Sequence, residues 1–333
     1  MEVKLSASRI KTAQSCSWIY WTKYKQKLPD TNNDGARRGT VCHNVFEFLS
    51  KQKTKTHFNK IVKAQNPFAS KAVEDLIMSD ATEMGVTDED NMSMIKEMIL
   101  NGLSCNFHGE DLGIPDEAYA ELDFDIEQNG YHIRGFIDQL FLYKDKKIAI
   151  IRDYKTSKKM FEGKEKEDNL QDYMYCLAVK NLFPEYVNRS AEFLFLKFDL
   201  NKNGLMKMEP IEEDDLEGFE LQLASVQDYL ENFDEHDAVA NFAADKGFPS
   251  DGSFSGKLQC GFAKEKGQLK KDGTVMWHCP YKFDFFYAEI KDKDGQFVSS
   301  CFQEDFNKEM VPEEGSHEIK YYKGCPKHLT KGS

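Results

Sequence analysis

The sequence predicts a mixed α/β fold in which a central sheet is flanked by helices. Three features of residues 119–198 support this prediction: an alternating strand pattern, an Asn-Gly turn, and a change to helical spacing after the third strand. The order strand, helix, strand after a hairpin is typical of a mixed sheet. With 333 residues, 40% of them hydrophobic, the chain is long enough for one large domain or two ordinary ones.

Two helical segments are expected before the sheet. "LSASRIKTAQSCSWIYWTKYKQKL" begins with Ser and Thr residues that suit a helix start, and "DTNNDG" then interrupts it. "GTVCHNVFEFLS" places apolar residues on one helical stripe, with His43 and Glu47 four apart on a neighbouring face. A polar, helical insertion is predicted at about 60–110.

Three consecutive strands should follow as a meander. In "YAELDFDI" apolar residues alternate with acidic ones, as in a half-buried strand, and "EQNG" supplies a hairpin turn. "YHIRGFIDQLFLY" is the returning strand. After "KDKK", the apolar run "IAIIRDYK" is the third strand.

The remaining elements complete the sheet and then become harder to assign. "NLQDYMYCLAVKNLF" has helical spacing and "AEFLFLKF" is strand-like. An acidic amphipathic helix is expected within "EPIEEDDLEGFELQLASVQDYLENF", and short aromatic strands such as "YKFDFFYAEI" within the last 90 residues. We therefore expect a core over residues 1–205 and a cysteine-containing extension over 206–333 that packs on this core or completes it.

Charge is distributed unevenly along the chain. The net charge is −13, yet residues 1–60 carry 12 Lys/Arg against 4 Asp/Glu, whereas residues 61–135 carry 4 against 16. The first segment could hold a polyanion while the second stays in solvent; ordinary solvated surface is the alternative. No apolar stretch approaches the roughly 20 residues of a membrane span, and the first residues lack the apolar block of a secretory signal. We expect a soluble, cytoplasmic protein without a membrane partner.

The end of the third strand combines an acid and a base. Asp153 and Lys155 are two apart, so on a strand they point the same way. Asp138 in "GFID" can lie beside them if the strands pair in the right register, and Gly135 would leave space for a substrate backbone. Two carboxylates at one point are suited to Mg²⁺, which activates water and offsets phosphoryl charge. By itself, the Asp-x-Lys triplet is better explained by a surface salt bridge at a strand end.

Five ordered motifs over residues 5–178 resemble the RecB-like branch of the PD-(D/E)xK nuclease superfamily. "GFID", "DYKTS" and "LQDYMYCLA" are similar to its G-x-[IV]-D strand, D-Y-K-T strand and Q-x-x-x-Y helix. "GTVCHNVFEFL" is similar to its G-x-x-x-H-x-x-x-E helix, and "SASRIKTAQSC" to its opening segment. The resemblance, which includes AddB-type and CRISPR-adaptation nucleases, implies a restriction-endonuclease-like sheet.

The resemblance also implies roles for individual residues. His43, Asp138 and Asp153 would bind the metal, together with the carbonyl of Tyr154. Lys155 would be the catalytic lysine. Gln171 and Tyr175, one helical turn apart, would orient this lysine or the DNA strand. Two acids stay open: Glu47 is a partner of His43 or an exposed acid, and Glu121 supports the site or, as we favour, faces solvent.

Phosphate contacts are expected at both sides of the strand end. Arg37 and Arg38 precede the His43 helix and fit contacts to phosphate, although a solvated loop would have the same composition. Thr156 and Ser157 follow the catalytic strand and would either hydrogen-bond phosphate or simply turn the chain.

Eight cysteines are spread widely, which is unlike the dense disulfide frame of a small secreted domain. Several relatives in the RecB-like branch hold a 4Fe-4S cluster with one N-terminal and three C-terminal cysteines. The set to test is therefore Cys16, Cys260, Cys279 and Cys325. The usual C-x2-C-x5-C spacing is absent, so structural or unpaired cysteines are the favoured interpretation; a cluster comes second, and a zinc site that includes His278 comes third.

The resemblance implies a Mg²⁺- or Mn²⁺-dependent deoxyribonuclease, with an exonuclease as the main expectation. It would act on single-stranded DNA or free DNA ends in recombination or repair. No G-x-x-x-x-G-K-[ST] loop is present, so any unwinding would need a helicase or recombination partner. A non-catalytic DNA-end-binding or scaffold subunit is the alternative from another class, and an RNA-directed enzyme is a third.

Overall fold

A computed structural model describes residues 3–31, 33–245, 260 and 263–329. The chain divides into two compact units that interleave in sequence. The first unit contains residues 1–7 and 32–231, and the second contains residues 8–31 and 232–333. The segment at 8–31 therefore belongs with the C-terminal part of the chain rather than with the helix that follows it.

A five-stranded sheet forms the centre of the first unit, in the order β1-β2-β3-β4-β5. The strands are β1 (Glu117–Gln128), β2 (Tyr131–Tyr143), β3 (Ile148–Lys155), β4 (Asn188–Phe195) and β5 (Leu205–Lys207). Neighbours are antiparallel except for β3 and β4, which are parallel and joined through a helix. The predicted mixed sheet, beginning with a three-strand meander, is confirmed.

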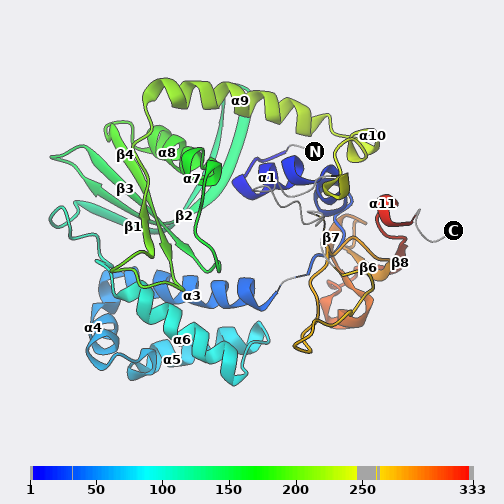
Figure 1. Cartoon of the computed structure of the whole chain (residues 1–333), viewed down its shortest axis with the longest axis horizontal. Helices are drawn as coiled ribbons and strands as arrows, with labels where there is room; N and C mark the ends of the chain where they lie inside the picture. The colour runs from blue at the N-terminus through cyan, green and yellow to red at the C-terminus, as the bar shows by residue number, and fades with distance from the viewer. Residues whose placement is uncertain (1–2, 32, 246–259, 261–262, 330–333) are drawn as a thin grey trace. The chain divides into compact units, whose positions relative to one another are not determined.

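Helices cover both faces of this sheet (Figure 1). On one face lies α3 (Asp34–Ser50) with the helical insertion α4 (Lys55–Ala64), α5 (Lys71–Glu83) and α6 (Glu89–Leu103). On the other lie α7 (Lys164–Glu167), α8 (Leu170–Leu182) and α9 (Glu213–Glu231). The predicted arrangement of a mixed α/β sheet flanked by helices, with a helical insertion, is thus confirmed.

The predicted Asn-Gly turn joins β1 to β2. Asn129 and Gly130 both have positive φ, 49° and 81°, which is the backbone that a tight hairpin requires. Gly135, in β2, has a different role from the one expected. A Cβ atom there would lie 2.6 Å from the ring of Phe124 on β1. The glycine makes room for this aromatic ring, so the prediction that it makes room for a substrate backbone is wrong.

Helix α3 is anchored by its cap and by its apolar stripe. The side chain of Asn33 accepts a hydrogen bond from the Ala36 amide and begins the helix. Val41, Val45 and Leu49 are fully buried in a core shared with α5 and α6. Their burial at helical spacing leaves His43, on an adjacent face, directed toward the sheet.

Helix α9 belongs to the sheet-containing unit. Gln227 accepts a hydrogen bond from the His132 amide of β2, and Glu220 accepts one from the Tyr131 hydroxyl at 2.7 Å. Its buried apolar residues include Leu216 and Leu223. The division at residue 231 therefore lies beyond the predicted boundary at 205, because these contacts hold α9 against β2.

The second unit contains a three-stranded antiparallel sheet in the order β7-β6-β8. Its elements are α1 (Ala7–Ser15), α2 (Ser17–Tyr20), a π-helical turn (Trp21–Lys25), α10 (Glu235–Ala238), β6 (Phe285–Lys291), β7 (Phe297–Phe302), β8 (Ser316–Tyr322) and α11 (Pro326–Leu329). Trp18 is buried, and its indole N–H donates to the Tyr322 hydroxyl at 2.8 Å. The N-terminal helices are thus tied to the strand at the other end of the chain.

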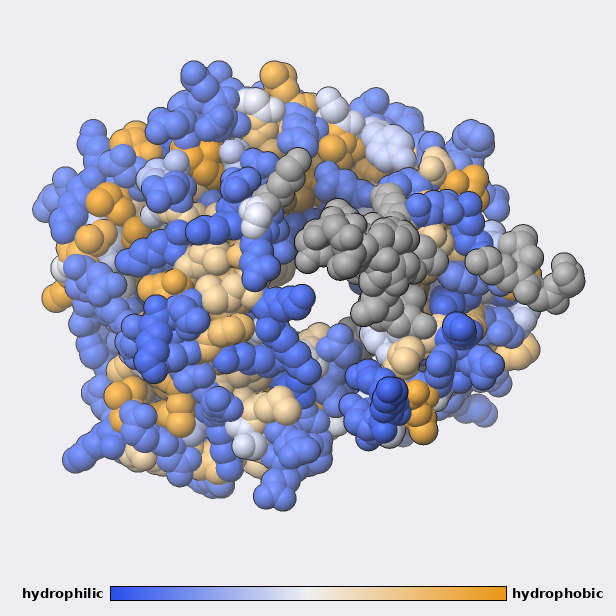
Figure 2. Space-filling model, viewed as in Figure 1, coloured by the Kyte–Doolittle hydropathy of each residue, from blue (hydrophilic) through white to orange (hydrophobic). Residues whose placement is uncertain are grey.

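Hydrophilic side chains cover most of the surface in view in Figure 2, with hydrophobic ones in scattered patches. Within the described residues, no helix combines the length and the apolar character needed to cross a membrane.

Candidate active site

The third strand delivers an acid and a base to one point, as its sequence predicts. Asp153 is 4% exposed, and its Oδ2 lies 2.6 Å from the Lys155 ammonium. The angles of this contact do not make a hydrogen bond, so Oδ2 has an ion-pair partner but accepts no hydrogen bond within the described part of the chain. The Lys155 ammonium is therefore the positive charge that compensates this buried oxygen.

Helix α8 places two polar side chains over this pair. The Asn169 side chain accepts from the Gln171 and Asp172 amides and fixes where the helix begins. Gln171 donates to Asp153 Oδ1 at 2.7 Å and accepts from Lys155 at 2.6 Å, and the Tyr175 hydroxyl donates to the same Asp153 oxygen at 2.8 Å. Because residues four apart share a helix face, Gln171 and Tyr175 hold the orientation of the Asp153 carboxylate and of the Lys155 ammonium.

Asp138 lies at the adjacent position of the neighbouring strand. Gln139 pairs with Arg152, so Asp138 and Asp153 are the next residues toward the site on β2 and β3. Asp138 Oδ2 accepts the Tyr154 amide hydrogen at 2.7 Å. Burial and the negative charge of Asp153 raise the Asp138 pKa. Two carboxylates held this close repel each other and favour a shared cation.

His43 reaches this group from α3. Its Nδ1 lies 3.2 Å from Asp138 Oδ1, and its Nε2 lies 3.2 Å from the Tyr154 carbonyl oxygen. Burial alone would lower the His43 pKa, but hydrogen bonds to Asp138 and Glu121 and the charges of the two aspartates raise it to about 10. Without a bound cation, His43 is therefore an imidazolium at neutral pH, and its charge compensates the neighbouring carboxylates.

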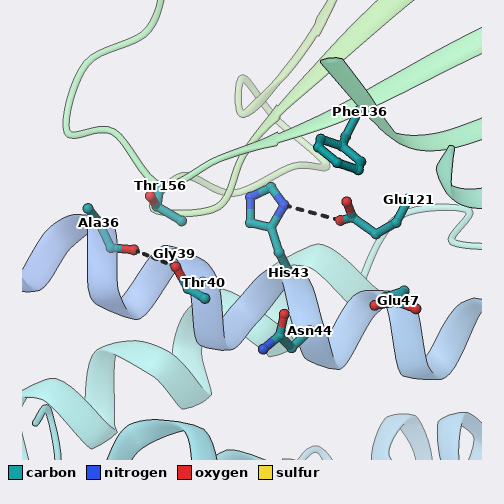
Figure 3. A pocket seen from close by; sticks show the side chains of 9 residues that line it. All are labelled: Ala36, Gly39, Thr40, His43, Asn44, Glu47, Glu121, Phe136 and Thr156. Atoms are coloured by element: carbon teal, nitrogen blue, oxygen red, sulfur yellow. Dashed lines mark hydrogen bonds and ion pairs between the residues drawn. The ribbon is translucent and has the colours of Figure 1, made fainter. Parts of the chain in front are cut away.

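Glu121, which the sequence left open with a preference for solvent, lies close to His43 and Asp138. Its Oε1 lies 3.8 Å from His43 Nδ1, and one ligand atom each from His43, Glu121 and Asp138 lies within 4.8 Å of the other two. His43 and Glu121 point toward each other from α3 and β1 (Figure 3). The alternating pattern of β1 suggested a solvent-facing acid; the backbone of Glu121, with a φ of 48°, departs from the strand conformation on which that expectation rested.

Glu47 has an ion-pair partner on its own helix. Its carboxylate contacts Lys51 at 2.8 Å and its side chain is 37% exposed, one turn beyond His43. Of the two roles left open by the sequence, this geometry fits the exposed acid, although Glu47 still lines the cleft described next.

A cleft of about 600 Å³ opens beside these groups. One wall is the face of α3 from Ala36 to Glu47, and the other is made by Glu121, Phe136 and Thr156 (Figure 3). Gly39 permits the close approach of these walls, because a Cβ atom there would lie 3.0 Å from the Thr156 hydroxyl oxygen. Thr156 therefore lines the cleft immediately after the end of β3.

The two predicted arginines differ in exposure. Arg37 is half-exposed and lies 3.8 Å from Asp34. Arg38 is 7% exposed and hydrogen-bonds the Asn91 side chain, while its Nε has no hydrogen-bond partner among the described residues. Lys197 lies within electrostatic range of Arg38 and Lys158, and burial together with these two charges lowers its pKa.

Behind the site, a buried network fixes the strands that carry the acids. Arg152 forms an ion pair with Glu192 of β4 at 2.6 Å and donates to the carbonyls of Asn106 and Phe107. Gln139 accepts from the Tyr154 hydroxyl at 2.9 Å. Because these side chains join β2, β3 and β4, they hold Asp138 and Asp153 at a fixed separation.

The second unit brings together the four cysteines that were singled out from the sequence. Cys16, Cys260, Cys279 and Cys325 are each at most 8% exposed. Every pair among them is close enough for electrostatic interaction. Burial and the proximity of the other thiols raise the pKa of Cys279 to about 12 and that of Cys325 to about 11.

Comparison with known proteins adds the family. A family model described as the PD-(D/E)XK nuclease superfamily matches residues 4–249. A crystal structure from Eubacterium rectale, provisionally described as an exonuclease, is 10% identical, with a TM-score of 0.42 over 69% of this chain and 81% of that one. Protein VC1899 from Vibrio cholerae is 12% identical, with a TM-score of 0.23 over 60% and 57%. No curated protein sequence matches the chain.

Proposed function

The chain belongs to the PD-(D/E)XK nuclease superfamily, and from this premise we propose that it is a Mg²⁺- or Mn²⁺-dependent nuclease that hydrolyses phosphodiester bonds in DNA. The observation that carries the proposal is the convergence of Gln171, Tyr175 and Lys155 on Asp153 beside a second buried carboxylate. A structural salt bridge at a strand end does not need this set of partners.

The ligand set fits a hard divalent cation. Asp138, Asp153 and the Tyr154 carbonyl supply oxygen ligands, and His43 supplies an imidazole nitrogen. Such a cation lowers the pKa of bound water and offsets charge on the phosphoryl group. To bind the cation, His43 would have to release its proton, and the neighbouring carboxylates would then stabilise the charge of the metal in place of that of the imidazolium.

Lys155 is the proposed catalytic lysine, and it acts through its positive charge. Its ammonium contacts Asp153 Oδ2 and donates to Gln171, so it is fixed on the same side of β3 as the carboxylates. From there it can orient the attacking water or stabilise the charge that develops on the phosphorus-bound oxygens. Gln171 and Tyr175 act as positioning residues.

The DNA strand would enter along the cleft between α3 and the end of β3. Arg37, Arg38 and Thr156 are the proposed phosphate contacts, and Lys158 and Lys197 add positive charge near Arg38. Since α3 rises about 7.5 Å between Arg38 and His43, the two arginines lie about one and a half helical turns from this metal ligand. That placement suits a phosphate next to the one that is cut.

We further propose that the chain is an exonuclease of the RecB-like branch that processes DNA ends in recombination or repair, with unwinding by a helicase partner. The order and spacing of five motifs over residues 5–178 support the branch. Linear and covalently closed circular DNA of the same sequence test whether cleavage requires a free DNA end. Degradation of the linear form alone is expected, and equal cleavage of both would identify an endonuclease instead.

The proposed cofactor of the second unit is a metal centre held by the four cysteines, with an iron-sulfur cluster as the first choice. All four are free, buried thiols. Their sulfurs do not form a group within 4.8 Å among the described residues, whereas a tetrahedral zinc ion would hold them about 3.8 Å apart. Four thiolates from distant parts of the chain are the usual ligand set of such a cluster.

Colour and metal analysis of the purified protein test this cofactor. We expect bound iron and sulfide and an absorption band at about 400 nm, as for other thiolate-ligated clusters. Cys279→Ala should abolish the band, whereas Cys301→Ala, at a half-exposed cysteine outside the set, should not. Stoichiometric zinc without iron would identify a zinc site instead of a cluster. Protein that is purified anaerobically and contains no metal would contradict the proposal.

Cleavage of labelled DNA tests the main proposal. Wild-type protein should cut with Mg²⁺ or Mn²⁺ and stop with chelator, and Asp153→Asn should reduce the rate by at least 10³-fold while DNA binding persists. Asp168→Asn, at an exposed acid before α8, is the matched control. A non-catalytic DNA-end-binding subunit would bind DNA without cutting it. Cleavage of RNA but not of DNA would identify an RNA-directed enzyme.

A further inference from the structure

One aromatic side chain in the active-site cleft is left uncovered. Strand β2 is buried along most of its length, and within it only Arg134 and Phe136 are exposed. Phe136 is 47% exposed, and it is the only exposed phenylalanine among the described residues of the first unit. Its ring lines the cleft, and in the view of Figure 3 it lies above the His43 and Glu121 side chains. Core packing therefore does not explain this ring.

The sheet prevents Phe136 from turning into the core. Successive residues of a strand point to opposite faces, and the neighbouring Ile137 is fully buried on the other face. The space on that face next to Gly135 is already filled, because the ring of Phe124 lies 2.6 Å from where a Cβ atom of this glycine would be. The Phe136 ring therefore stays on the cleft side of the sheet, with about half of its surface open to solvent.

Phe136 lies one strand repeat from the site carboxylate Asp138. Residues two apart on a strand point the same way and are separated by about 6.5 Å, so Arg134, Phe136 and Asp138 form a row on one face of β2. At one end of the row, Asp138 contacts His43 at 3.2 Å. At the other end, the Arg134 guanidinium lies 6.0 Å from the centre of the Phe136 ring. A nucleotide whose phosphate is bound beside Asp138 would thus have a base within reach of this ring.

The charges around the ring favour a base over a phosphate. Asp123 lies opposite Phe136 in the register of β1 with β2, and Glu121 lines the same wall of the cleft. These carboxylates repel phosphate oxygens but not the uncharged face of a nucleobase. Arg134, the nearby cation, lies 3.8 Å from Asp123 and is partly neutralised by it. The arginines proposed as phosphate contacts come from α3, which forms the opposite wall. A strand in the cleft would therefore turn its phosphates toward α3 and a base toward Phe136.

We propose that Phe136 is a base-stacking platform that selects single-stranded DNA, with one unpaired base on its ring while a neighbouring phosphodiester is cut. This inference rests on the proposed nuclease function and names its substrate class. Every nucleobase has a π-face, so an aromatic side chain binds single strands with little regard to sequence. In a duplex the same base is paired and stacked on its neighbours, and it must leave the stack before it reaches the ring, which costs free energy.

Oligonucleotides with one abasic site test the stacked base. The kcat/KM of the full chain is measured with Mn²⁺ on a labelled single strand and on strands that lack one base at successive positions around the cut. In wild type, loss of the stacked base should lower kcat/KM about fivefold or more at one position. Phe136→Leu, which keeps an apolar side chain without a π-face, should show a similar loss on the intact strand and no further loss at the abasic position. Phe136→Tyr should restore the wild-type pattern.

Phe286→Leu is the matched control, because Phe286 has a similar exposure of 53% but lies on β6 of the second unit; it should keep the wild-type response to the abasic site. Thermal unfolding verifies that each variant is folded. A hairpin duplex of the same sequence should be cut more slowly than the single strand by wild type, and Phe136→Leu should narrow this difference.

Three results would overturn the inference and leave the nuclease proposal intact. They are an unchanged kcat/KM for folded Phe136→Leu, the same loss for this variant on abasic and intact strands, and faster cleavage of the duplex than of the single strand by wild type. Wild-type protein that cuts no DNA with either metal would overturn both proposals.

Discussion

Replacement of Asp172 by Asn should make the protein more stable at alkaline pH. Asp172 lies in the first turn of α8, next to the site residue Gln171, and is 3% exposed. Burial raises its pKa from 3.8 to about 7, and only the hydrogen bond from the Cys176 thiol, at 3.5 Å, opposes this. The folded protein thus retains a proton that the unfolded chain releases near pH 4.

The effect of pH on the free energy of unfolding follows from the difference between the pKa of Asp172 in the folded and in the unfolded chain. Between pH 4 and pH 7 the folded state binds more protons than the unfolded state, so this group lowers the free energy of unfolding as pH rises, and its effect levels off above pH 7. At 1.36 kcal/mol for each pKa unit, about 3 kcal/mol is lost between pH 5 and pH 8. The positive end of the α8 dipole stabilises the carboxylate and reduces this loss to about 2 kcal/mol.

Urea unfolding at pH 5, 6, 7 and 8 measures the effect. The free energy of unfolding of Asp172→Asn, relative to wild type, should rise by about 2 kcal/mol across this range. Asp168→Asn, at an exposed acid just before the same helix, should show a flat difference. Parallel pH profiles for wild type and Asp172→Asn would mean that Asp172 is ionised in the folded protein and would refute the reasoning.

Three further outcomes are expected. Glu192→Gln should lower the free energy of unfolding by about 3 kcal/mol in urea titrations, because the buried guanidinium of Arg152 loses its counter-ion; a change below about 1 kcal/mol would contradict the role given to this pair. Tyr175→Phe should slow DNA cleavage about tenfold, by removing one hydrogen bond to Asp153, while thermal stability changes little; an unchanged rate would remove Tyr175 from the positioning group. At subsaturating Mg²⁺, cleavage should accelerate from pH 6.5 to pH 8, since metal binding displaces the proton of a His43 whose pKa is about 10; the same slope in His43→Asn would show that another group is responsible.

Much of the fold and part of the site were predictable because they rest on local patterns. The period-two alternation of β1, the Asn129-Gly130 turn and the apolar run of β3 are each encoded within about ten residues. The motif residues Asp153, Lys155 and Gln171 also lie where their spacing predicts, because a strand and a helix have fixed repeats.

Other features depend on contacts between distant segments, which no local pattern contains. The role expected for Gly135 failed because the ring of Phe124 crosses the strand pair there. The strand period favoured a solvent-facing Glu121, but the left-handed backbone of this residue departs from the strand conformation. The division of the chain at residues 8–31 and 232 likewise depends on long-range packing, such as the bond between Trp18 and Tyr322.

The sequence by itself determined the order of the strands, the position of each motif on them and the family to which they belong. Only the tertiary structure decided which side chains meet: His43 with Asp138, Glu121 with both, and Cys16 with cysteines about 250 residues or more away. The physical reason is that secondary structure follows from interactions between neighbours in the chain. A site, in contrast, forms where packing brings together charges and ligands that the chain keeps far apart.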